Sequence, residues 1–355
     1  MRQNNFDLLR LVFAIAVVFE HAYLVGLGPL RLSAFGVTFE GYNALQCFFV
    51  ISGYLIFQSW ENSSSVWSYA SKRIRRVYPA YAAVVIGMAF LGGALTTLSP
   101  AAYFGSSEWF RYLGTNLLFL NFLQPSLPGV FTGSVEPIVN GPLWTIKVEV
   151  MFYMTVPLLA LLRRRINFLV LMTGIYVVSV IWHEYFFYLY HDTGRDVFDV
   201  LRRQLPGQMS FFVAGGLAYY YLDAFRKRAH LLAAVSLVVV IAHLKLGYLM
   251  PLFPMALAIV VIYAAEIVPC LGNAGRFGDL SYGTYVLHYP VLQIVAQLAL
   301  FGTPRTSFAG GFAIALTLAY LSWHLIEKPA LLRSSHYRKA EEAAAGSERE
   351  VSKGA

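Results

Sequence analysis

The feature that most constrains this chain is a succession of apolar runs, each about as long as a bilayer is thick. A helix that crosses the hydrocarbon core needs about 20 mainly apolar residues. Ten segments of this kind follow one another: Leu8–Gly26, Tyr42–Trp60, Tyr78–Leu98, Pro142–Leu162, Asn167–Tyr190, Leu205–Phe225, His230–Gly247, Leu249–Val268, Leu280–Phe301 and Phe308–Ile326. The pattern predicts an all-α, polytopic membrane protein of about ten transmembrane helices.

Composition supports a membrane environment and argues against other classes. The 355 residues are 58% hydrophobic and 13% charged, about half the charged share of a soluble domain. The net charge of +8 is held in short clusters between apolar runs, which is typical of cytoplasmic loops, so we expect no nucleic-acid partner. The two cysteines and the His residues show no disulfide or metal-site spacing. Charged residues interrupt the first apolar run, which indicates a retained helix and not a cleaved signal peptide.

The basic clusters predict the topology. They lie at Lys72–Arg76, at Arg163–Arg165, at Arg226–Arg228 and from Arg333 onward. Ten spans place all four clusters on the cytoplasmic side together with both termini, whereas an eleventh span at Trp109–Gln124 would move the second and third cluster outward. We therefore expect Trp109–Gln124 to be a re-entrant or interfacial segment. Residues 1–332 then form one transmembrane domain, and the charged, Ala-rich residues 333–355 a disordered cytoplasmic tail.

The first helix carries ionisable residues on one face. An ionisable side chain inside a span raises the free energy of membrane insertion by about 2.5–3.5 kcal/mol, so such a residue is expected to have a structural or functional role. Arg10 and His21 are separated by three turns plus about 20°, and by about 16 Å along the axis. Asp7 lies one turn before Arg10 and is expected to orient its guanidinium. Two plainer explanations stay open: Arg10 reaches the interface by snorkelling, and His21 hydrogen-bonds a neighbouring helix.

A second polar position follows in the segment that begins at Pro142. Glu149 lies about 9 Å below the outer end of this helix, close to the depth expected for His21, and Tyr153 lies one turn further along. An imidazole beside a carboxylate is suited to general base catalysis, in which His takes a proton and Glu stabilises the resulting cation. The alternative is a structural contact of Glu149 with Lys147 or Tyr153.

Two further features allow a structural and a functional interpretation. Ser52-Gly53 provides a small surface against which a neighbouring helix or a thin ligand can approach. Arg73 and Arg76 belong to the basic cluster before Pro79. This cluster suits an orientation signal or an anionic lipid contact, and it equally suits the phosphates of a cytosolic donor.

Taken in order, these segments resemble the acyltransferase-3 family of multispanning membrane acyltransferases. The similarity covers about residues 6–330. The matching pieces are Asp7-Leu-Leu-Arg10 with His21, Phe48–Tyr54, Arg73–Pro79, Pro142–Tyr153, Leu280–Pro290 and Ile326–Pro329. Two departures are Thr145-Ile-Lys147 before Glu149, where the family often has Leu and Ser, and the lack of the extracytoplasmic hydrolase-like domain of some relatives.

The resemblance implies a function and roles for residues. It implies a membrane O-acyltransferase of a bacterial inner membrane that moves an acyl group, most often acetyl, from acyl-coenzyme A to a hydroxyl of a glycan or similar acceptor. Acyl-coenzyme A is then a co-substrate, with no bound cofactor or metal. The expected catalytic residues are His21 and Glu149. The expected donor-binding residues are Arg10, Arg73 and Arg76. The residues expected to support the site are Asp7, Ser52 and Tyr153. For His288 and Glu327 we expect structural roles.

Two other classes of protein remain compatible with the residues alone. A transporter or flippase of a glycan or lipid-linked sugar also combines many spans with a polar track. A non-catalytic membrane scaffold is the third class, and it predicts that the buried Arg, His and Glu can be replaced by apolar residues without loss of function.

Overall fold

The computed structural model describes residues 4–28, 32–34, 37–271, 278–332 and 335. The regular secondary structure of this part of the chain is helical apart from one small hairpin, in which β1 (Leu32–Ala34) pairs antiparallel with β2 (Val37–Phe39). The hairpin is the one departure from the all-α prediction among these residues. The expected disordered tail falls outside the described residues, except for Ser335.

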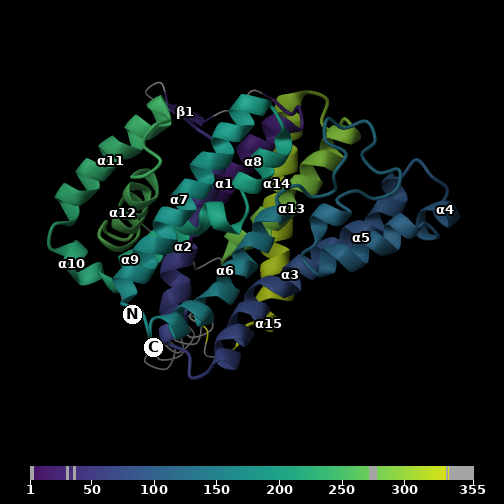
Figure 1. Ribbon diagram of the computed structural model, residues 1–355. Helices are drawn as coiled ribbons and strands as arrows, with labels where there is room; N and C mark the ends of the chain where they lie inside the picture. Colours follow the sequence, from purple (N-terminus) through teal and green to yellow (C-terminus); the bar gives the residue numbers. More distant parts are fainter. Residues whose placement is uncertain (1–3, 29–31, 35–36, 272–277, 333–334, 336–355) are drawn as a thin grey trace, which may run out of the picture. The chain divides into compact units, whose positions relative to one another are not determined.

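Each of the ten predicted spans overlaps a helix, although the bounds differ (Figure 1). The helices are α1 (Phe6–Leu24), α2 (Gly41–Glu61), α3 (Val66–Leu95), α6 (Leu143–Leu162), α7 (Phe168–Thr193), α9 (Leu205–Tyr220), α11 (Ala229–Leu246), α12 (Phe253–Glu266), α13 (Leu280–Gln297) and α14 (Pro304–Ser322). Short helices α8 (Asp196–Arg202) and α10 (Leu222–Arg226) flank α9. After α14 the chain makes a π-helical turn, Trp323–Glu327, and ends its helical part in α15 (Lys328–Ala330).

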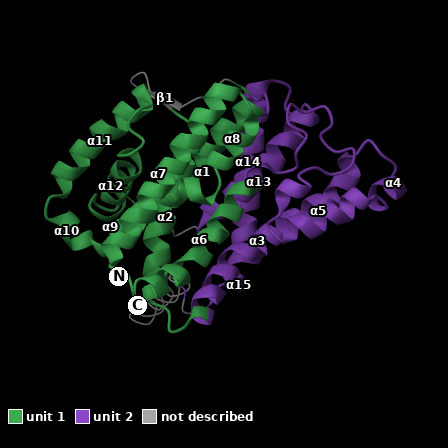
Figure 2. Cartoon of the chain, in the orientation of Figure 1, with its two compact units in different colours: residues 1–24, 28–66, 143–272 green, residues 25–27, 67–142, 273–355 purple. Residues whose placement is uncertain are grey.

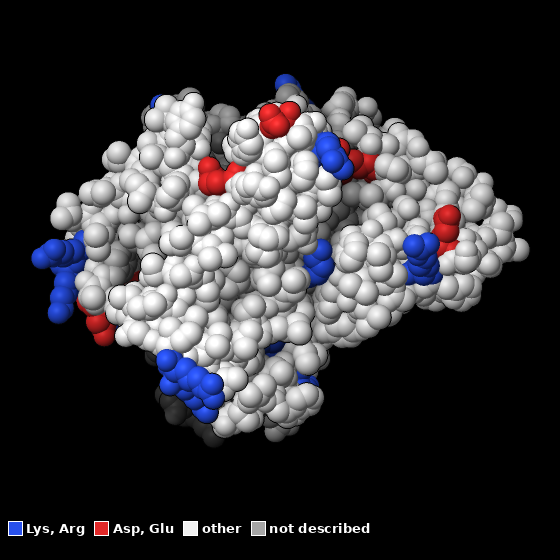
Figure 3. Space-filling model, viewed as in Figure 1, with Lys and Arg blue, Asp and Glu red and all other residues white. Residues whose placement is uncertain are grey.

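Among the described residues, five helices are long and apolar enough to cross a membrane. They are Val66–Leu95, Leu143–Leu162, Phe168–Thr193, Ala229–Leu246 and Pro304–Ala330. The face seen in Figure 3 is largely free of Lys, Arg, Asp and Glu, as expected of a surface that meets lipid. The chain is thus a membrane protein, but the predicted count of ten spans is not reached by these criteria. One reason is length: α12 has 14 residues and rises about 21 Å, less than the ~30 Å of the hydrocarbon core.

The segment Trp109–Gln124 does not form one long helix. It contains most of α5 (Ser107–Leu117) and a 3-10 turn, Asn121–Leu123, and α4 (Pro100–Phe104) precedes it. The break between α5 and the 3-10 turn is stabilised by buried Asn116, whose Nδ2 donates to the carbonyls of Tyr112 and Gln124, both at 2.9 Å. Eleven residues rise about 16 Å, so α5 is too short to cross a bilayer.

The described chain divides into two compact units, coloured in Figure 2. Unit 1 comprises residues 1–24, 28–66 and 143–272, and unit 2 comprises residues 25–27, 67–142 and 273–355. Every contact described below lies within one of them.

In unit 1, α2 packs against α9 with almost no space between the two backbones. A Cβ added to Gly53 would lie 2.0 Å from the carbonyl oxygen of Phe212, and one added to Gly215 would lie 2.0 Å from that of Val50. Small residues at such positions allow helices in membranes to approach closely. The prediction of helix packing at Ser52-Gly53 is therefore confirmed.

The start of α1 is anchored by the buried side chain of Asn5. Its Nδ2 donates to the carbonyls of Ala264, Val268 and Pro269 at 3.0–3.2 Å. Its Oδ1 accepts from the backbone N–H of Leu271 at 2.9 Å. The last carbonyls of a helix have no partner within the helix, so Asn5 satisfies the end of α12 and fixes where α1 begins.

In unit 2, α3, α13 and α14 form the helical core. The hydroxyl of Tyr282 in α13 donates to the carbonyl of Val77 in α3 at 2.8 Å. The side chain of Asn140 donates to the carbonyl of Val286 at 2.8 Å. These buried bonds to backbone carbonyls hold α3 and the loop before α6 against α13.

Candidate active site

The side chain of Glu149 lies at the centre of a hydroxyl-rich cluster in unit 1. Ser52 Oγ, in α2, donates to Glu149 Oε1 at 3.3 Å. The hydroxyl of Tyr153, one turn further along α6, donates to the same oxygen. Tyr153 is buried, whereas Ser52 and Glu149 are half-buried. The structure thus brings together three of the predicted site residues, and two helices fix the position of the carboxylate.

Lys147 does not supply the predicted alternative contact to Glu149. Its Nζ donates to Oε1 of Gln204, at the start of α9, at 2.8 Å. The contact between Glu149 and Tyr153 is present, as the structural alternative expected. The carboxylate of Glu149 therefore accepts hydrogen bonds from two neutral hydroxyls, which position it. Lys147 does not neutralise it, because its ammonium group bonds to Gln204.

Helix α1 is continuous and carries Asp7, Arg10 and His21. Asp7 Oδ1 lies 3.7 Å from Arg10 Nη1, which agrees with the predicted orienting role. His21 lies in the last turn of α1 and is half-buried. Because α1 is unbroken between them, the expected rise of about 16 Å from Arg10 to His21 applies.

Aromatic contacts show that α1 and α2 run antiparallel. The rings of Phe6 and Tyr54 have centroids 5.1 Å apart, and those of Phe13 and Phe48 are 6.0 Å apart. Ser52 lies between Phe48 and Tyr54 in sequence. It therefore lies level with the stretch of α1 between Phe6 and Phe13.

This pairing changes the depth assigned to Glu149. The carboxylate bonds to Ser52 and so lies nearer in depth to Arg10 than to His21. The matching depth predicted for His21 and Glu149 is not what the helix pairing gives. Depth was counted along α6 from its first residue, and that count contains no information on how α6 packs against α2.

In unit 2, Arg76 is enclosed by two buried carboxylates. Its Nη1 lies 3.2 Å from Glu327 Oε2, and its Nη2 pairs with Asp279. Both carboxylates are almost fully buried, and the guanidinium also lies over the rings of Tyr282 and Trp323 at 5.6 and 5.8 Å. A buried charge is stable only with such partners. Arg76 thus already has charged partners within unit 2 at the position where the resemblance placed a donor phosphate.

Asp279 and Glu327 complete this network, and sequence reasoning missed the first. Asp279 accepts the backbone N–H of Ser281 at 3.2 Å and caps α13; an Asp directly before a helix is a signal that could have been used. Ser322 Oγ donates to Glu327 Oε1 at 2.9 Å. The structural role expected for Glu327 agrees with this geometry.

The basic cluster does not precede a helix but lies within it. Helix α3 begins at Val66, well before the predicted start at Tyr78. Arg73 is half-buried and lies one turn before Arg76, so both share a helix face. Arg75 is exposed and donates to the carbonyl of Ala330 at 3.3 Å.

His288 has the structural role expected for it. The ring is fully buried, and Nδ1 lies 3.0 Å from the carbonyl oxygen of Thr284, one turn earlier in α13. A second polar cluster in unit 1, not predicted, surrounds Arg202. Its guanidinium pairs with Asp199 and lies 5.3 Å from the ring centre of Tyr42. Within the described ranges, no three His, Cys, Asp or Glu residues are grouped so that they could hold a metal ion.

Comparison with known proteins shows a single family along the chain. The family described as an acyltransferase domain, acyltransferase-3, matches residues 3–324. The chain is 28% identical to "O-acetyl transferase" of Shigella phage Sf6, over 94% of this chain and 98% of that protein. It is 29% identical to "Nodulation protein 10" of Rhizobium leguminosarum bv. viciae, over 94% and 95% of the two chains.

A third relative is longer than this chain. It is the "putative peptidoglycan O-acetyltransferase YrhL" of Bacillus subtilis, 23% identical over 90% of this chain and 56% of that protein. No solved structure matches the chain significantly. Because the family match spans nearly all the described helices, the chain belongs to the acyltransferase-3 family and is an acyltransferase.

Proposed function

We propose that this protein is a membrane O-acyltransferase that moves an acyl group, most simply acetyl, from acyl-coenzyme A to a hydroxyl of a cell-surface or exported glycan. The observation that carries this proposal is the family match over residues 3–324, together with the full-length similarity to a protein named "O-acetyl transferase". The name of the Bacillus subtilis relative supports a glycan as acceptor. The expected location is the inner membrane of a bacterium, with both termini cytoplasmic.

His21 is the proposed general base. A neutral imidazole nitrogen removes the proton from the acceptor hydroxyl, and the oxygen attacks the thioester carbonyl carbon. The carbon–sulfur bond then breaks, the coenzyme A thiolate leaves, and the proton passes to that sulfur. An acyl-histidine intermediate is the alternative route, with the imidazole attacking first. Either route depends on the ring of His21, which lies in a helix that is anchored at its start by Asn5.

Glu149 supports the reaction through charge and position. Its carboxylate is held by Ser52 and Tyr153 in the half of the bundle that faces Arg10. A fixed negative charge at this depth acts on Arg10 and on the donor, and not on the imidazolium that forms at His21. Arg10 is oriented by Asp7, and its positive charge attracts the acyl-coenzyme A donor.

The donor's phosphates are the proposed ligands of the basic cluster on α3. Arg73 makes the direct contact, since a guanidinium binds phosphate oxygens in pairs. Arg76 adds positive charge beside Arg73. Its ion pairs with Asp279 and Glu327 fix this turn of α3 to the residues before α13 and after α14.

The experiment supplies acetyl-coenzyme A, labelled in the acetyl group, to membranes that contain the protein and an isolated surface polysaccharide. Label on hydroxyl oxygens of the polysaccharide, released by mild base, supports the proposal. Label that stays on coenzyme A, while the glycan crosses the membrane, indicates a transporter instead and overturns it. Replacement of His21 by Ala is the negative control.

A further inference from the structure

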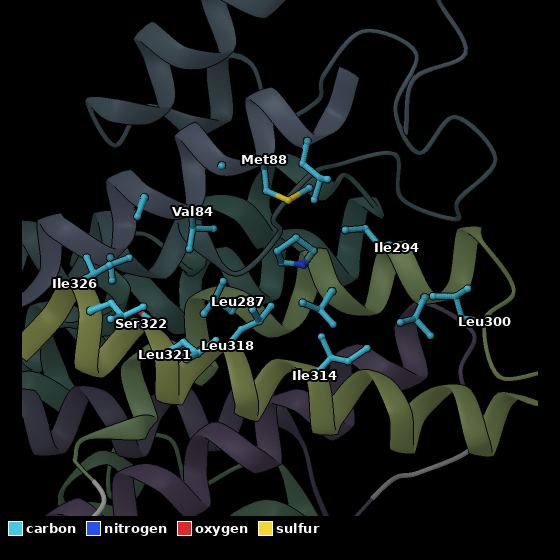
Figure 4. Close-up of a pocket in the computed structure, with 18 residues that line it drawn as sticks. Val84, Met88, Leu287, Ile294, Leu300, Ile314, Leu318, Leu321, Ser322 and Ile326 are labelled. Atoms are coloured by element: carbon cyan, nitrogen blue, oxygen red, sulfur yellow. The ribbon is translucent and has the colours of Figure 1, made fainter. Parts of the chain in front are cut away.

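Unit 2 contains an apolar cavity that the proposed reaction does not use. It has a volume of about 430 Å³ and is lined by 18 residues from α3, from α13 to the turn after it, and from α14 with its following turn. Figure 4 shows the side chains of Val84 and Met88 on one side and those of Ile314 and Leu318 on the other, facing the space between the helices. We call it the α3 groove.

The lining restricts what can occupy the α3 groove. Ser322 is the one lining residue with a hydroxyl, amide or charged side chain, and its Oγ already donates to Glu327 at 2.9 Å. A sugar or a nucleotide bound there would leave its polar groups without partners, which is costly. The groove therefore suits a hydrocarbon chain.

The shape of the α3 groove also suits a chain. On α3 the lining residues include Ala80, Val84, Gly87 and Leu91, whose spacing forms a stripe along one helix face about 16 Å long. A Cβ added to Gly87 meets no atom within 4 Å, so this glycine leaves open space in the stripe. Leu91 is exposed, which leaves the groove accessible from its side.

The surroundings place the α3 groove at membrane depth. Helix α3 and the segment Pro304–Ala330 are both long and apolar enough to cross a bilayer. They form two walls of the groove, so the solvent at its open side is lipid. Acyl chains are the abundant hydrocarbon of that solvent.

Charge at one end of the α3 groove selects the headgroup. The stripe on α3 continues toward the N-terminus into the basic cluster Lys72–Arg76, and the opposite wall continues into Lys328. The bond from Arg75 to the carbonyl of Ala330 joins these two ends. The cations at this end are Lys72, Arg73, Arg75, Arg76 and Lys328. Two carboxylates, Asp279 and Glu327, pair with Arg76, so positive charge is in excess. A cluster of this kind attracts anionic lipid headgroups.

We propose that the α3 groove binds one acyl chain of an anionic phospholipid, with the phosphate of the headgroup at Lys72, Arg75 and Lys328, the cations of the basic end that the proposed donor site does not use. The lipid is then a bound component of unit 2 and not part of the reaction. This inference holds whether or not the protein transfers acetyl groups, since it depends on the cavity and its charged end alone.

The test uses the purified full-length protein in nanodiscs that contain phosphatidylglycerol with a photoreactive diazirine in the acyl chain. After illumination, labelled peptides are mapped by mass spectrometry. Label is expected on groove residues of α3 and α14, such as Met88 and Ile314. The same diazirine chain on zwitterionic phosphatidylcholine is expected to label them less.

Gly87→Leu fills the groove and is expected to lower this labelling about tenfold, the equivalent of roughly 1.4 kcal/mol. Gly174→Leu is the matched control, since Gly174 lies in apolar helix α7 and an added Cβ there also meets nothing within 4 Å. Ala83→Leu, at another lining position, replaces Gly87→Leu if that variant does not fold. Unchanged labelling in the filled groove, or equal labelling by the two lipids, would overturn the proposal.

Discussion

Ser52 Oγ and Glu149 Oε1 lie 3.3 Å apart, and this contact joins α2 to α6 at the carboxylate that the sequence marks as functional. The two residues are 97 positions apart in the chain. Because Tyr153 donates to the same oxygen, the carboxylate is positioned by hydrogen bonds from two helices. Substitutions at Ser52 and Glu149 separate the effect of the charge from that of the hydrogen bonds.

Glu149→Gln keeps the shape and removes the charge. We expect transfer to fall by about 10²–10³-fold, the range for loss of one electrostatic contact in an active site. Ser52→Ala removes one hydrogen bond, usually a matter of 0.5–1.5 kcal/mol, so its rate is expected to fall by only about tenfold or less. Rates are measured with labelled acetyl-coenzyme A at equal amounts of inserted protein. Equal rates for Glu149→Gln and Ser52→Ala would contradict a role for the charge.

His21→Ala is expected to abolish transfer while leaving expression and insertion intact, because the ring is proposed to take the proton of the acceptor. Glu20→Gln is the matched control, since Glu20 is adjacent in the helix but points about 100° away. Initial rates across pH extend the test: activity that needs a neutral imidazole rises with pH and then levels. A His21→Ala protein with full activity would remove this residue from the mechanism.

Arg76→Met leaves Asp279 and Glu327 without their cation. Breaking a buried ion pair from one side costs about 3–5 kcal/mol, so the variant is expected to unfold at clearly lower temperature in detergent. Arg73→Gln is the comparison: we expect near-normal stability and a raised KM for acyl-coenzyme A. Thermal unfolding and steady-state kinetics give both values. A stable Arg76→Met protein with a raised KM would instead assign donor binding to Arg76.

Gly53→Leu places a side chain where the carbonyl of Phe212 lies, 2.0 Å from the added Cβ. Helix α9 cannot move away without losing its packing against α2, so the yield of monodisperse protein is expected to collapse. Gly114→Leu, in α5, adds the same side chain where no atom lies within 4 Å of the new Cβ and is expected to behave like the parent. Size-exclusion chromatography of the two variants decides the point.

Much of the fold could be predicted because membrane helices depend on local sequence. Apolar length located a helix at each of the ten segments, and the polar residues within α5 and after it mark a break. The start of α3 was missed, because the prediction counted apolar residues and the first turns of α3 carry Lys72 and Arg73, which a helix can hold as readily as a loop.

The site was harder to predict, because its contacts join distant parts of the chain. Arg76 lies 203 and 251 positions from its two carboxylates, and no local pattern reports such a pairing. The depth of Glu149 likewise depends on how α2 packs against α1, which the ring contacts of Phe6 and Phe13 reveal. The residue types and their partners one turn away were identifiable, as for Arg10 with Asp7 and Glu149 with Tyr153, but the partners on distant helices were not.

The anchor at the start of α1 has a chemical consequence. Three carbonyl oxygens converge on the amide nitrogen of Asn5, a position that only a donor can fill. Deamidation to Asp would exchange that donor for a negatively charged acceptor and set four oxygens against one another. Deamidation at this one amide would therefore loosen the start of the helix that carries His21.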